Sequence, residues 1–337
     1  MKVIIHGYNT CCQNKAGGVQ VRIRKIASLL KKRGIEVELF NPFVTDVSTC
    51  DVLHIFGLGI ENRTLILCAK QQSKLIVMSA VVPITNKMKL YLYKFLHHFP
   101  IYTTYSVLYD SLQMTDVVIV ETQAEADFLH RFYSVNYKKM VVIPNGIDAF
   151  TYQGDEIFTR LCKHCDYVLQ VGRFDKNKNQ LNVIKAIKGT GIDMVFIGGA
   201  EITEQSYYQK CVDEAKGHDN IHFLGWLSQD SPLFQSAYAN AKLVILPSHY
   251  ETFGLVLLEG GMAGADLALS NTLPILCYSS FKKCRTFDPN NIKQMREVIK
   301  DAFERPKDVT LKDKLINEFN WDTIIDQHIK IYSVIGE

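Results

Sequence analysis

Two carboxylates stand eight residues apart around the start of one predicted helix. Glu251 lies in a polar loop after a buried strand that ends before Pro247, and Glu259 lies in the apolar helical run that opens at Gly254. A strand–loop–helix unit of this kind presents the free N–H groups of its first helical turn, which can bind a phosphate. Carboxylates accept hydrogen bonds from sugar hydroxyls, so the segment suits a ligand with phosphate and hydroxyl groups. The alternative is that Glu251 is favoured by the helix dipole and Glu259 is a solvated surface residue.

A second stretch places basic side chains on a strand-to-helix loop. Arg173 and Lys178 stand between the predicted strand 167–171 and the predicted helix 180–188. Basic groups at the carboxyl end of a strand can neutralise a diphosphate and the charge that develops on its departure. A solvated basic loop would contain the same residues, but this loop lies opposite the Glu251 loop in the same half of the chain, which favours a shared site.

The sequence lacks the motifs of several other kinds of catalytic or metal site. The sequence has no GxxxxGK[ST] phosphate loop, no HExxH zinc motif and no GxSxG nucleophile motif. His218 and His222 are four residues apart, but their Gly, Asp and Asn neighbours favour a turn over a helix. Cys162 and Cys165 form the only CxxC among nine cysteines, without a second ligand pair. We therefore expect reduced thiols and no metal site.

These loops are connected by apolar runs that alternate with helical patterns. In the first half of the chain, the runs predict strands at 1–7, 35–40, 52–56, 75–78, 117–120 and 140–143. In the second half, they predict strands at 167–171, 194–197, 221–224, 243–246 and 267–270. Helical spacing between them includes 19–33, 124–132 and 180–188. Strand alternating with helix predicts parallel strands with right-handed crossovers, so we expect an α/β protein with two Rossmann-like, doubly wound domains facing a central cleft.

Length and charge narrow the class of protein. A chain of 337 residues exceeds what one core usually serves, which favours two domains. Its 38 basic and 35 acidic residues leave a net charge of +3, so we expect no nucleic-acid partner. No apolar stretch approaches the ~18 residues of a membrane-spanning helix, and the first apolar run is too short for a secretory signal. We expect a cytoplasmic protein, unless it docks on the inner face of a membrane.

Several motifs, taken in order along the chain, resemble one enzyme family. They are Gly17-Gly18, Val142-Ile-Pro-Asn-Gly-Ile-Asp148, Val171-Gly-Arg-Phe174 continued by Lys178-Asn-Gln180, Phe223-Leu-Gly225, and Pro247-Ser followed by Glu251 through Glu259. The last of these is an E-x7-E signature. The sequence resembles the nucleotide-sugar-dependent glycosyltransferases of group 1 (family 4), which have the GT-B fold, and the resemblance extends over nearly the whole chain.

The resemblance implies a catalytic role for three side chains. Arg173 and Lys178 would bind the donor diphosphate and stabilise the leaving nucleoside diphosphate, and Glu251 would contact hydroxyls of the donor sugar. It also implies transfer with retention of anomeric configuration, with no metal and no cofactor beyond the nucleotide-sugar substrate. The basic side chains would then neutralise the charge that a divalent ion neutralises in other enzymes.

The other donor contacts implied by the resemblance come from main-chain groups, glycines and one more acid. Glu259 would bind the ribose hydroxyls, and the loop before the first helix would approach the donor closely because its glycines carry no side chain. These glycines are Gly17 and Gly18. The N–H groups that would bind the phosphates are those near Phe253, Gly254 and Leu255.

The resemblance also divides the chain by role. Residues 1–150 would form the acceptor-binding domain, 151–318 would bind the nucleotide-sugar donor, and 319–337 would form a helix that returns to the first domain. The acceptor would be a hydroxyl of a glycan or of a lipid-linked glycan. The sugar would be a hexose, and the reaction would serve surface polysaccharide synthesis.

Two positions depart from the family pattern. Ala80 stands where the family often has a histidine near the reacting sugar, which leaves open a catalytically weak or silent sugar-nucleotide-binding subunit. Gly260-Gly261 replaces a run of small helical residues, and each glycine costs a helix about 1 kcal/mol relative to alanine. The helix therefore either ends early or packs tightly there. A GT-B sugar-nucleotide epimerase is a further alternative, although its donor-site patterns match less well.

The segment 86–99 has a helical pattern with two faces. One face carries Met88, Leu92, Phe95, Leu96 and Phe99, and the other carries Lys87, Tyr91, Lys94 and His98. One interpretation is a helix whose apolar stripe packs in the core. The other is a basic, aromatic-rich face that meets an anionic membrane surface holding a lipid-linked acceptor.

Overall fold

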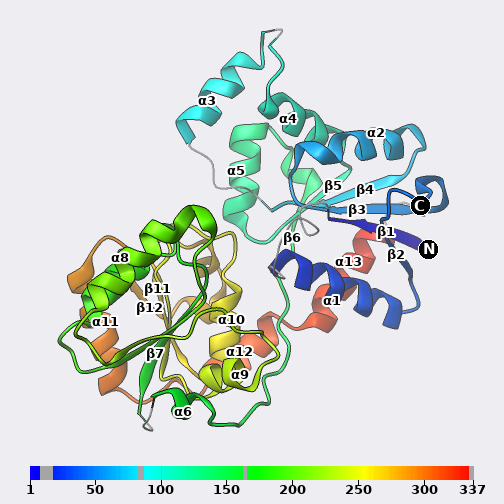
Figure 1. Ribbon diagram of the computed structural model, residues 1–337. Helices are drawn as coiled ribbons and strands as arrows, with labels where there is room; N and C mark the ends of the chain where they lie inside the picture. Colours follow the sequence, from blue (N-terminus) through cyan, green and yellow to red (C-terminus); the bar gives the residue numbers. More distant parts are fainter. Residues whose placement is uncertain (8–17, 82–86, 100, 162–164, 334–337) are drawn as a thin grey trace. The chain divides into compact units, whose positions relative to one another are not determined.

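The computed structural model describes residues 1–7, 18–81, 87–99, 101–161 and 165–333. The chain divides into two units, which are described separately below (Figure 1). Met1–Gly146 and the segment that begins at Trp321 form the first unit, and Ile147–Asn320 forms the second.

The first unit is built on a parallel sheet. Its strands are β1 (Lys2–His6), β2 (Glu36–Leu39), β3 (Val52–Phe56), β4 (Leu75–Ser79), β5 (Val117–Val120) and β6 (Met140–Val142), in the order β2-β1-β3-β4-β5-β6. Its helices are α1 (Gly18–Lys32), α2 (Arg63–Gln71), α3 (Lys87–Leu96), α4 (Thr104–Met114), α5 (Gln123–Tyr133) and α13 (Trp321–Ser333). Helices α2 to α5 contribute to the core on one face of the sheet, and α1 and α13 to the core on the other.

The second unit repeats this architecture. Its strands are β7 (Tyr167–Val171), β8 (Asp193–Ile197), β9 (Ile221–Phe223), β10 (Leu243–Leu246), β11 (Asp266–Ser270) and β12 (Arg285–Phe287), in the order β12-β11-β10-β7-β8-β9. Its helices are α6 (Ile157–Leu161), α7 (Gln180–Ile187), α8 (Gln205–Ala215), α9 (Pro232–Ala239), α10 (Leu255–Met262), α11 (Ile292–Glu304) and α12 (Leu311–Glu318). Helices α6, α9, α10 and α12 cover one face, and α7, α8 and α11 the other. The two doubly wound sheets confirm the expected fold class.

The strand order of the second sheet fixes where a ligand site can form. Strands β8 and β9 follow on one side of β7, whereas β10 to β12 follow on the other side. The loops after β7 and β10 therefore leave neighbouring strands at the same edge of the sheet. Open α/β sheets bind ligands at such a switch in strand order, outside the carboxyl ends of the strands. The predicted basic loop and the Glu251 loop are these two loops.

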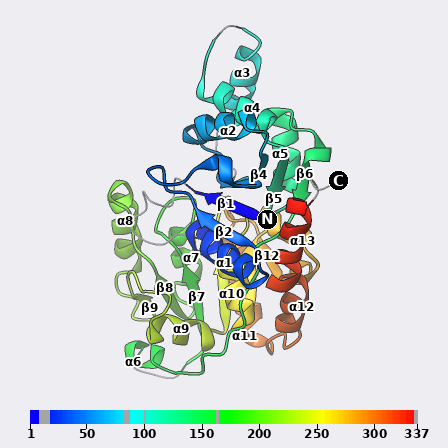
Figure 2. The ribbon, with the colours of Figure 1, turned by 90° about the vertical axis from the view of Figure 1, so that its right-hand side faces the viewer.

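The last helix packs against the first unit. Arg33, which follows α1, pairs with Asp322 at 2.8 Å and also with Asp326, both on α13. The buried Tyr332 hydroxyl lies 2.7 Å from Nδ1 of His54 on β3. Figure 2 shows α13 beside the first sheet, next to α1. The end of the chain is thus joined to its beginning by ion pairs and by apolar packing.

Two expectations from the sequence need correction. Strand β12 escapes prediction because Arg285–Phe287 contains a single fully buried apolar side chain. The apolar stripe of segment 86–99 does not pack in the core, since Met88 is 80% exposed and Phe95 is 62% exposed, while Leu90 is the buried residue of α3. Within the described residues, no helix combines the length and the hydrophobicity that a membrane crossing needs.

Helix α10 continues through its two glycines and packs tightly at both. A Cβ atom on Gly260 would lie 2.6 Å from Cγ2 of Val244 on β10. A Cβ atom on Gly261 would overlap Cδ1 of Leu315 on α12. Of the two alternatives left open by the sequence, close packing is therefore the correct one.

Candidate active site

The loop after β7 carries both predicted basic residues. Its course is fixed by the N–H of Phe174, which donates to the carbonyl of Gly199 at 2.9 Å and so extends the contact between β7 and β8 beyond the strands. Nε2 of Gln180 donates to the carbonyl of Arg173 at 2.7 Å and joins the loop to the start of α7. Arg173 and Lys178 therefore project from a loop whose main chain is fixed on both sides.

Two asparagines join this loop to the loop after β10. The side chain of Asn177 accepts a hydrogen bond from the Tyr250 N–H at 3.0 Å and donates one to the Tyr250 carbonyl at 2.9 Å. The N–H of His249 donates to the Asn177 carbonyl at 2.9 Å. Asn179 is buried in a left-handed conformation, with φ +60°, and donates to the Pro247 carbonyl at 3.2 Å. These bonds hold the two loops side by side.

The joined loops bring Lys178 and Glu251 into contact. Nζ of Lys178 donates to Oε1 of Glu251 at 2.5 Å, and the two side chains are 20% and 14% exposed. Arg173 is 58% exposed and lies 4.0 Å from the carboxylate of Asp175. The edge of the sheet thus carries an ion pair that is reached by solvent and a guanidinium group that is mostly in solvent.

The start of α10 adds main-chain donors beside this pair. Gly254 precedes the helix with φ +108°, a conformation that favours glycine, and no side chain caps the helix. Phe253 is buried and packs edge-on against Phe319, with ring centroids 5.9 Å apart. Because the first-turn N–H groups of a helix lack intrahelical acceptors, those of Gly254 and Leu255 can bind an anion.

Glu259 occupies a different environment from Glu251. It lies on the second turn of α10, and its Oε2 accepts a hydrogen bond from the Tyr238 hydroxyl on α9 at 2.7 Å. Burial raises the pKa of Glu259, and the Tyr238 hydrogen bond opposes this shift. The structure therefore places Glu259 beneath the helix start, and Glu251 with Lys178 at the loop edge.

An aromatic residue that the sequence analysis does not assign lies at the same edge. The N–H of Gly198 donates to the carbonyl of Gly225 at 2.8 Å, so the loop after β9 runs beside the loop after β8. Trp226 follows and is 42% exposed. A Cβ atom on Gly199 would lie 2.5 Å from Nε1 of Trp226, so the indole lies against that glycine. Its position directly after Phe223-Leu-Gly225 is the sequence signal that could have identified it.

The predicted residues of the first unit fall partly outside the described chain. Gly17 lies outside the described residues, and Gly18 is the first residue of α1. Ala80 follows β4, is buried within the core cluster, and its N–H donates to the Ile119 carbonyl at 2.8 Å. The position that the family often gives to histidine thus holds a small core side chain here.

The first unit contains a buried polar cluster that sequence reasoning misses. Arg22 on α1 forms an ion pair with Glu121 after β5, and Nδ2 of Asn145 donates to Oε1 of Glu121 at 2.7 Å. The Glu121 N–H donates to Oε2 of Glu125 at 2.7 Å. Burial first, and then the neighbouring Glu121 charge, raise the pKa of Glu125 to about 8. The sequence signal that could have revealed this cluster is Arg22, a charged residue at a position where the helical spacing predicts a buried side chain.

The described residues offer no cluster of three or more metal-ligating side chains. His218 lies in a turn, as expected, and His222 on β9 lies 3.2 Å from a carboxylate oxygen of Asp193. Cys162 lies outside the described residues, and Cys165 is partly buried. Neither pair forms part of the loop edge described above.

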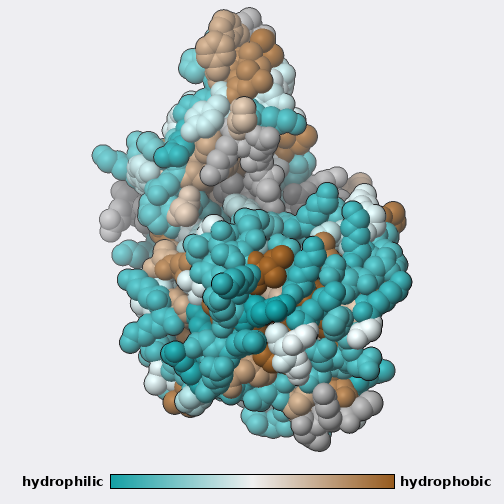
Figure 3. Space-filling model, turned by 90° about the vertical axis from the view of Figure 1, so that its left-hand side faces the viewer, coloured by the Kyte–Doolittle hydropathy of each residue, from teal (hydrophilic) through white to brown (hydrophobic). Residues whose placement is uncertain are grey.

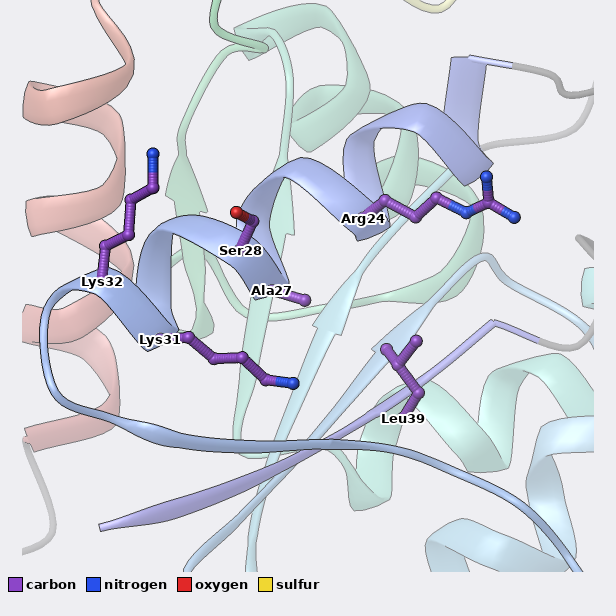
Figure 4. A pocket seen from close by; sticks show the side chains of 6 residues that line it. All are labelled: Arg24, Ala27, Ser28, Lys31, Lys32 and Leu39. Atoms are coloured by element: carbon purple, nitrogen blue, oxygen red, sulfur yellow. The ribbon is translucent and has the colours of Figure 1, made fainter.

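Two hollows lie near basic residues. One, of about 310 Å³, adjoins the basic loop and is lined by Arg173, Phe174, Asp175, Lys176, Asn177, Glu201, Thr203 and Glu204. The other, of about 520 Å³, lies on the first unit and is lined by Arg24, Ala27, Ser28, Lys31, Lys32 and Leu39. Figure 4 shows Arg24 and Lys31 on the side of α1 that faces Leu39, and Lys32 pointing away. The first hollow extends the candidate site, and the second is an open basic groove on α1.

The second unit matches a family of known enzymes. Residues 162–318, slightly less than half of the chain, match the model described as glycosyl transferases group 1. A glycogen synthase of Mycobacterium tuberculosis is 26% identical over 230 residues, which cover 65% of this chain and 54% of that protein. The chain therefore spans about half the length of this curated relative.

Solved structures resemble nearly the whole chain. Anabaena Alr3699/HepE, solved in complex with UDP, superposes with a TM-score of 0.77 at 16% identity, covering 99% of this chain and 100% of that one. A sucrose-phosphate synthase of Thermosynechococcus elongatus gives a TM-score of 0.77 at 17% identity, with 98% of both chains covered. At such identities the likeness establishes the fold, which is the GT-B fold of glycosyltransferases.

Proposed function

We propose that the protein is a glycosyltransferase that uses a nucleotide-sugar donor. The observation that carries the proposal is the meeting of Lys178 and Glu251 at the strand switch of the second unit, beside the uncapped start of α10. A cation and main-chain N–H donors suit the diphosphate, and a carboxylate suits the sugar hydroxyls. The match of residues 162–318 to group 1 glycosyl transferases supports the proposal, as does the UDP complex of Alr3699/HepE.

In the proposed reaction, an acceptor hydroxyl oxygen replaces the diphosphate oxygen on the anomeric carbon of the sugar. The bond between that carbon and the diphosphate breaks, its electron pair leaves with the nucleoside diphosphate, and the hydroxyl proton is released. Arg173 and Lys178 stabilise the departing charge, which is the task a divalent ion performs in other enzymes. We therefore propose a metal-independent reaction and, on the family resemblance, one that retains the anomeric configuration.

The proposed donor pose uses the remaining residues of the loop edge. The N–H groups of Phe253, Gly254 and Leu255 bind the phosphates, and Glu251 binds sugar hydroxyls. Oε1 of Glu259, the oxygen that does not accept the Tyr238 hydrogen bond, binds the ribose. To bind the diphosphate, Lys178 must exchange part of its contact with Glu251 for phosphate oxygens. Binding therefore releases Glu251 to accept hydrogen bonds from the sugar.

We assign one wall of the base site to Trp226. Its indole lies against Gly199, whose carbonyl accepts the hydrogen bond that fixes the Arg173 loop. An exposed aromatic ring at the same edge of the sheet as the Arg173 loop suits a planar nucleobase. Stacking of two aromatic rings stabilises a complex by more than their buried area alone would. Since the chain has two tryptophans, quenching of Trp226 fluorescence by a nucleoside diphosphate, measured in a Trp321→Phe background, checks this contact.

We assign the acceptor to the first unit. The proposed acceptor is a hydroxyl of a glycan or of a lipid-linked glycan, the transferred sugar is a hexose, and the pathway is surface polysaccharide synthesis at the cytoplasmic face of a membrane. These assignments rest on the family resemblance. Gly17, and Gly18 at the start of α1, are proposed to approach the donor from this unit.

Ala80 supports a second candidate, a sugar-nucleotide-binding subunit without turnover. Mass spectrometry of reactions with UDP-, GDP- and dTDP-hexoses separates the possibilities, with Lys178→Ala as the matched control. An active transferase releases nucleoside diphosphate and yields a glycosylated acceptor or free hexose, and the control loses this turnover. For a silent subunit, binding of a nucleotide-sugar shifts the melting temperature of the protein, but the nucleotide-sugar stays intact. An epimerase converts the donor to a stereoisomer.

A further inference from the structure

The basic groove on α1 has no part in the proposed donor site. It is the hollow of about 520 Å³ on the first unit, here called the α1 groove, and its volume lies within the range of sites that bind small ligands. Its lining combines three basic side chains with one hydroxyl and two apolar side chains. Among the residues that the structure describes, no acid lines it. These residues are Arg24, Ala27, Ser28, Lys31, Lys32 and Leu39.

One side of α1 forms the long wall of the groove. Arg24, Ser28 and Lys31 follow one another at the four- and three-residue spacing that aligns side chains along a helix. The rise of an α-helix places Arg24 and Lys31 about 10 Å apart, with Ser28 between them. Figure 4 shows both basic side chains on the side of α1 that faces Leu39 on β2. The groove therefore presents two positive charges with a hydroxyl between them.

The acids of the neighbouring strand lie on the other face of the sheet. Val37 on β2 belongs to the core cluster to which α1 contributes, and Leu39, two residues further on, lies on the same face because side chains alternate along a strand. Glu36 and Glu38 therefore lie on the opposite face. There Nζ of Lys2 lies 3.7 Å from Oε1 of Glu36 and 2.9 Å from Oε2 of Glu38. These carboxylates do not neutralise the groove.

The remaining basic residues of α1 have partners on α13. Nζ of Lys25 lies 6.0 Å from the ring centroid of Trp321, and Arg33, which follows α1, pairs with Asp322 at 2.8 Å. Within the described residues, no such partner from the chain pairs with Arg24 or Lys31, and both are exposed. The charges of the α1 groove are therefore available to an anionic ligand.

The rest of the lining narrows the class of ligand. Arginine and lysine bind carboxylate or phosphate oxygens, and the Ser28 hydroxyl can donate a hydrogen bond to a sugar hydroxyl or accept one. Ala27 and the half-exposed Leu39 offer an apolar floor for the C–H face of a sugar ring. Leu39 ends β2, so the groove reaches the carboxyl edge of the sheet, where α/β folds bind ligands.

We propose that the α1 groove binds an acidic glycan. Carboxylate or phosphate groups of the glycan contact Arg24 and Lys31, and the sugar between them lies over Ala27. This inference rests on the proposed function, which assigns a glycan acceptor to the first unit, and it narrows that acceptor to glycans that carry negative charge. Arg24 and Lys31 bind the glycan without contact to the reacting atoms.

Fluorescence anisotropy of labelled oligosaccharides tests the groove without using turnover. One matched pair is oligogalacturonate and its methyl ester, which has the same sugars without the charges. The other pair is a phosphorylated dextran oligomer and the unmodified oligomer, so that the two pairs separate carboxylate from phosphate. The unmodified chain should bind a charged member and not its neutral counterpart, and added salt should weaken this binding. Absence of binding to both charged oligosaccharides overturns the proposal.

A double variant and a charge-matched control locate the contact. Arg24→Gln/Lys31→Gln should weaken binding roughly fivefold or more, and its melting temperature should not fall, because both side chains are exposed. The control Lys89→Gln/Lys138→Gln removes the same net charge at two other exposed positions. Its Lys89 belongs to α3, at the end of the first unit where Figure 3 shows hydrophobic atoms gathered, and α3 packs on the opposite face of the sheet from α1. The control should bind as the unmodified chain does, and equal losses would overturn the groove.

A substitution at Ser28 tests the space between the two charges. In Ser28→Glu the new carboxylate is four residues after Arg24 and three before Lys31, so it can pair with both along the helix. We expect the acidic oligosaccharide to lose its binding while the helix stays stable. Ser28→Gln, which has the same size without the charge, is the control and should bind more tightly than Ser28→Glu. Equal affinities of these two variants contradict the assignment.

Two further readouts keep the proposal separate from its alternatives. Sedimentation with phosphatidylglycerol vesicles reports a lipid contact, and vesicle binding that Arg24→Gln/Lys31→Gln abolishes, without oligosaccharide binding, would assign the groove to headgroups and overturn the glycan. Hydrolysis of a nucleotide-sugar without acceptor reports the proposed transferase chemistry. Hydrolysis without oligosaccharide binding rejects the groove alone, whereas oligosaccharide binding without hydrolysis rejects only the transferase.

Discussion

Each sheet has an ion pair at the edge where its strands end, and the two pairs differ in burial. In the first unit, the side chains of Arg22 and Glu121 are 4% and 7% exposed, and Asn145 donates a further hydrogen bond to Glu121. In the second unit, Lys178 and Glu251 are 20% and 14% exposed. The buried pair is enclosed by protein, whereas the other pair has a side that solvent and ligands can reach.

This difference separates a structural role from a binding role. A charge that loses its partner inside the protein cannot be solvated, so breaking a buried pair costs stability. A pair at the surface contributes little to stability, because water replaces the lost partner. We therefore expect substitutions in the first pair to change unfolding and substitutions in the second pair to change ligand binding and turnover.

The largest effect is expected for Arg22→Met. It leaves the Glu121 carboxylate buried with a neutral amide as its partner, which should lower the free energy of unfolding by about 3–5 kcal/mol. Urea unfolding monitored on the first unit measures this loss, and nucleotide affinity at the second unit should stay within about twofold. The control Arg22→Met/Glu121→Gln removes the uncompensated charge and should recover part of the stability. An unchanged urea midpoint in Arg22→Met would show that the buried pair is not structural.

The pH dependence of stability should come from the same cluster. The folded-state pKa of Glu125 is raised to about 8, above the ~4.3 of an exposed carboxyl. Between these values the folded chain holds a proton that the unfolded chain has lost, so the free energy of unfolding should fall as pH rises from ~4.3 to ~8. Above ~8 this contribution is constant. Burial also raises the pKa of Glu121, which acts in the same direction.

Glu125→Gln removes the titrating group while retaining an oxygen that can accept the Glu121 N–H. Between pH ~5 and ~8, the free energy of unfolding of the unmodified chain should fall by an amount on the order of a few kcal/mol. We expect a flatter curve for the variant over the same range. Urea titrations at several pH values measure both slopes. Equal slopes in the two proteins would contradict the raised pKa.

The two loops of the second unit can be predicted from the sequence, but the contact between their side chains cannot. Local patterns suffice to predict β7, β10 and the helices that follow, because apolar runs and glycine stops are local signals. The bond between Lys178 and Glu251 depends on β7 and β10 being neighbours, and this adjacency follows from the strand order of the whole sheet. The sequence could therefore indicate two loops of matching chemistry but not the pairing of their side chains.

The same limitation explains what is missed in the first unit. Arg22 and Glu121 are 99 residues apart in the chain, and each alone is typical of a solvated surface. For segment 86–99 the helical pattern is correct, but the pattern does not show which face turns inward. The bulky residues Met88 and Phe95 face solvent, whereas Leu90 enters the core.

Loss of a basic group at the donor edge should reduce turnover strongly with little effect on folding. Lys178→Ala or Arg173→Ala removes one charge that stabilises the leaving diphosphate, and we expect turnover to fall about a hundredfold or more. The free energy of unfolding should change by less than ~1 kcal/mol, because both side chains are reached by solvent. Steady-state rates of nucleoside diphosphate release measure the first effect and urea unfolding the second. Full activity in both variants would reject the donor edge.

The smallest expected effect separates the two carboxylates of the E-x7-E signature. Glu251→Gln keeps the shape of the side chain but weakens a charge-assisted hydrogen bond to the donor sugar, worth about 1.5–3 kcal/mol. Affinity for the intact donor should therefore fall roughly ten- to a hundredfold. Affinity for the nucleoside diphosphate, which has no sugar, should be retained or rise, because Lys178 no longer has a charged competitor for the phosphates.

Glu259→Gln should give a different pattern, because a ribose contact is common to the donor and the nucleoside diphosphate. Both affinities should fall by similar factors. Tyr238→Phe is the matched control, since it removes the hydroxyl that occupies Oε2 of Glu259 and leaves the carboxylate in place. If that carboxylate binds the ribose, this control should also change both affinities together. Titration calorimetry with both ligands on the three variants measures the pattern. An identical pattern for Glu251→Gln and Glu259→Gln would mean that the two carboxylates, despite their different partners, do not divide the donor between them.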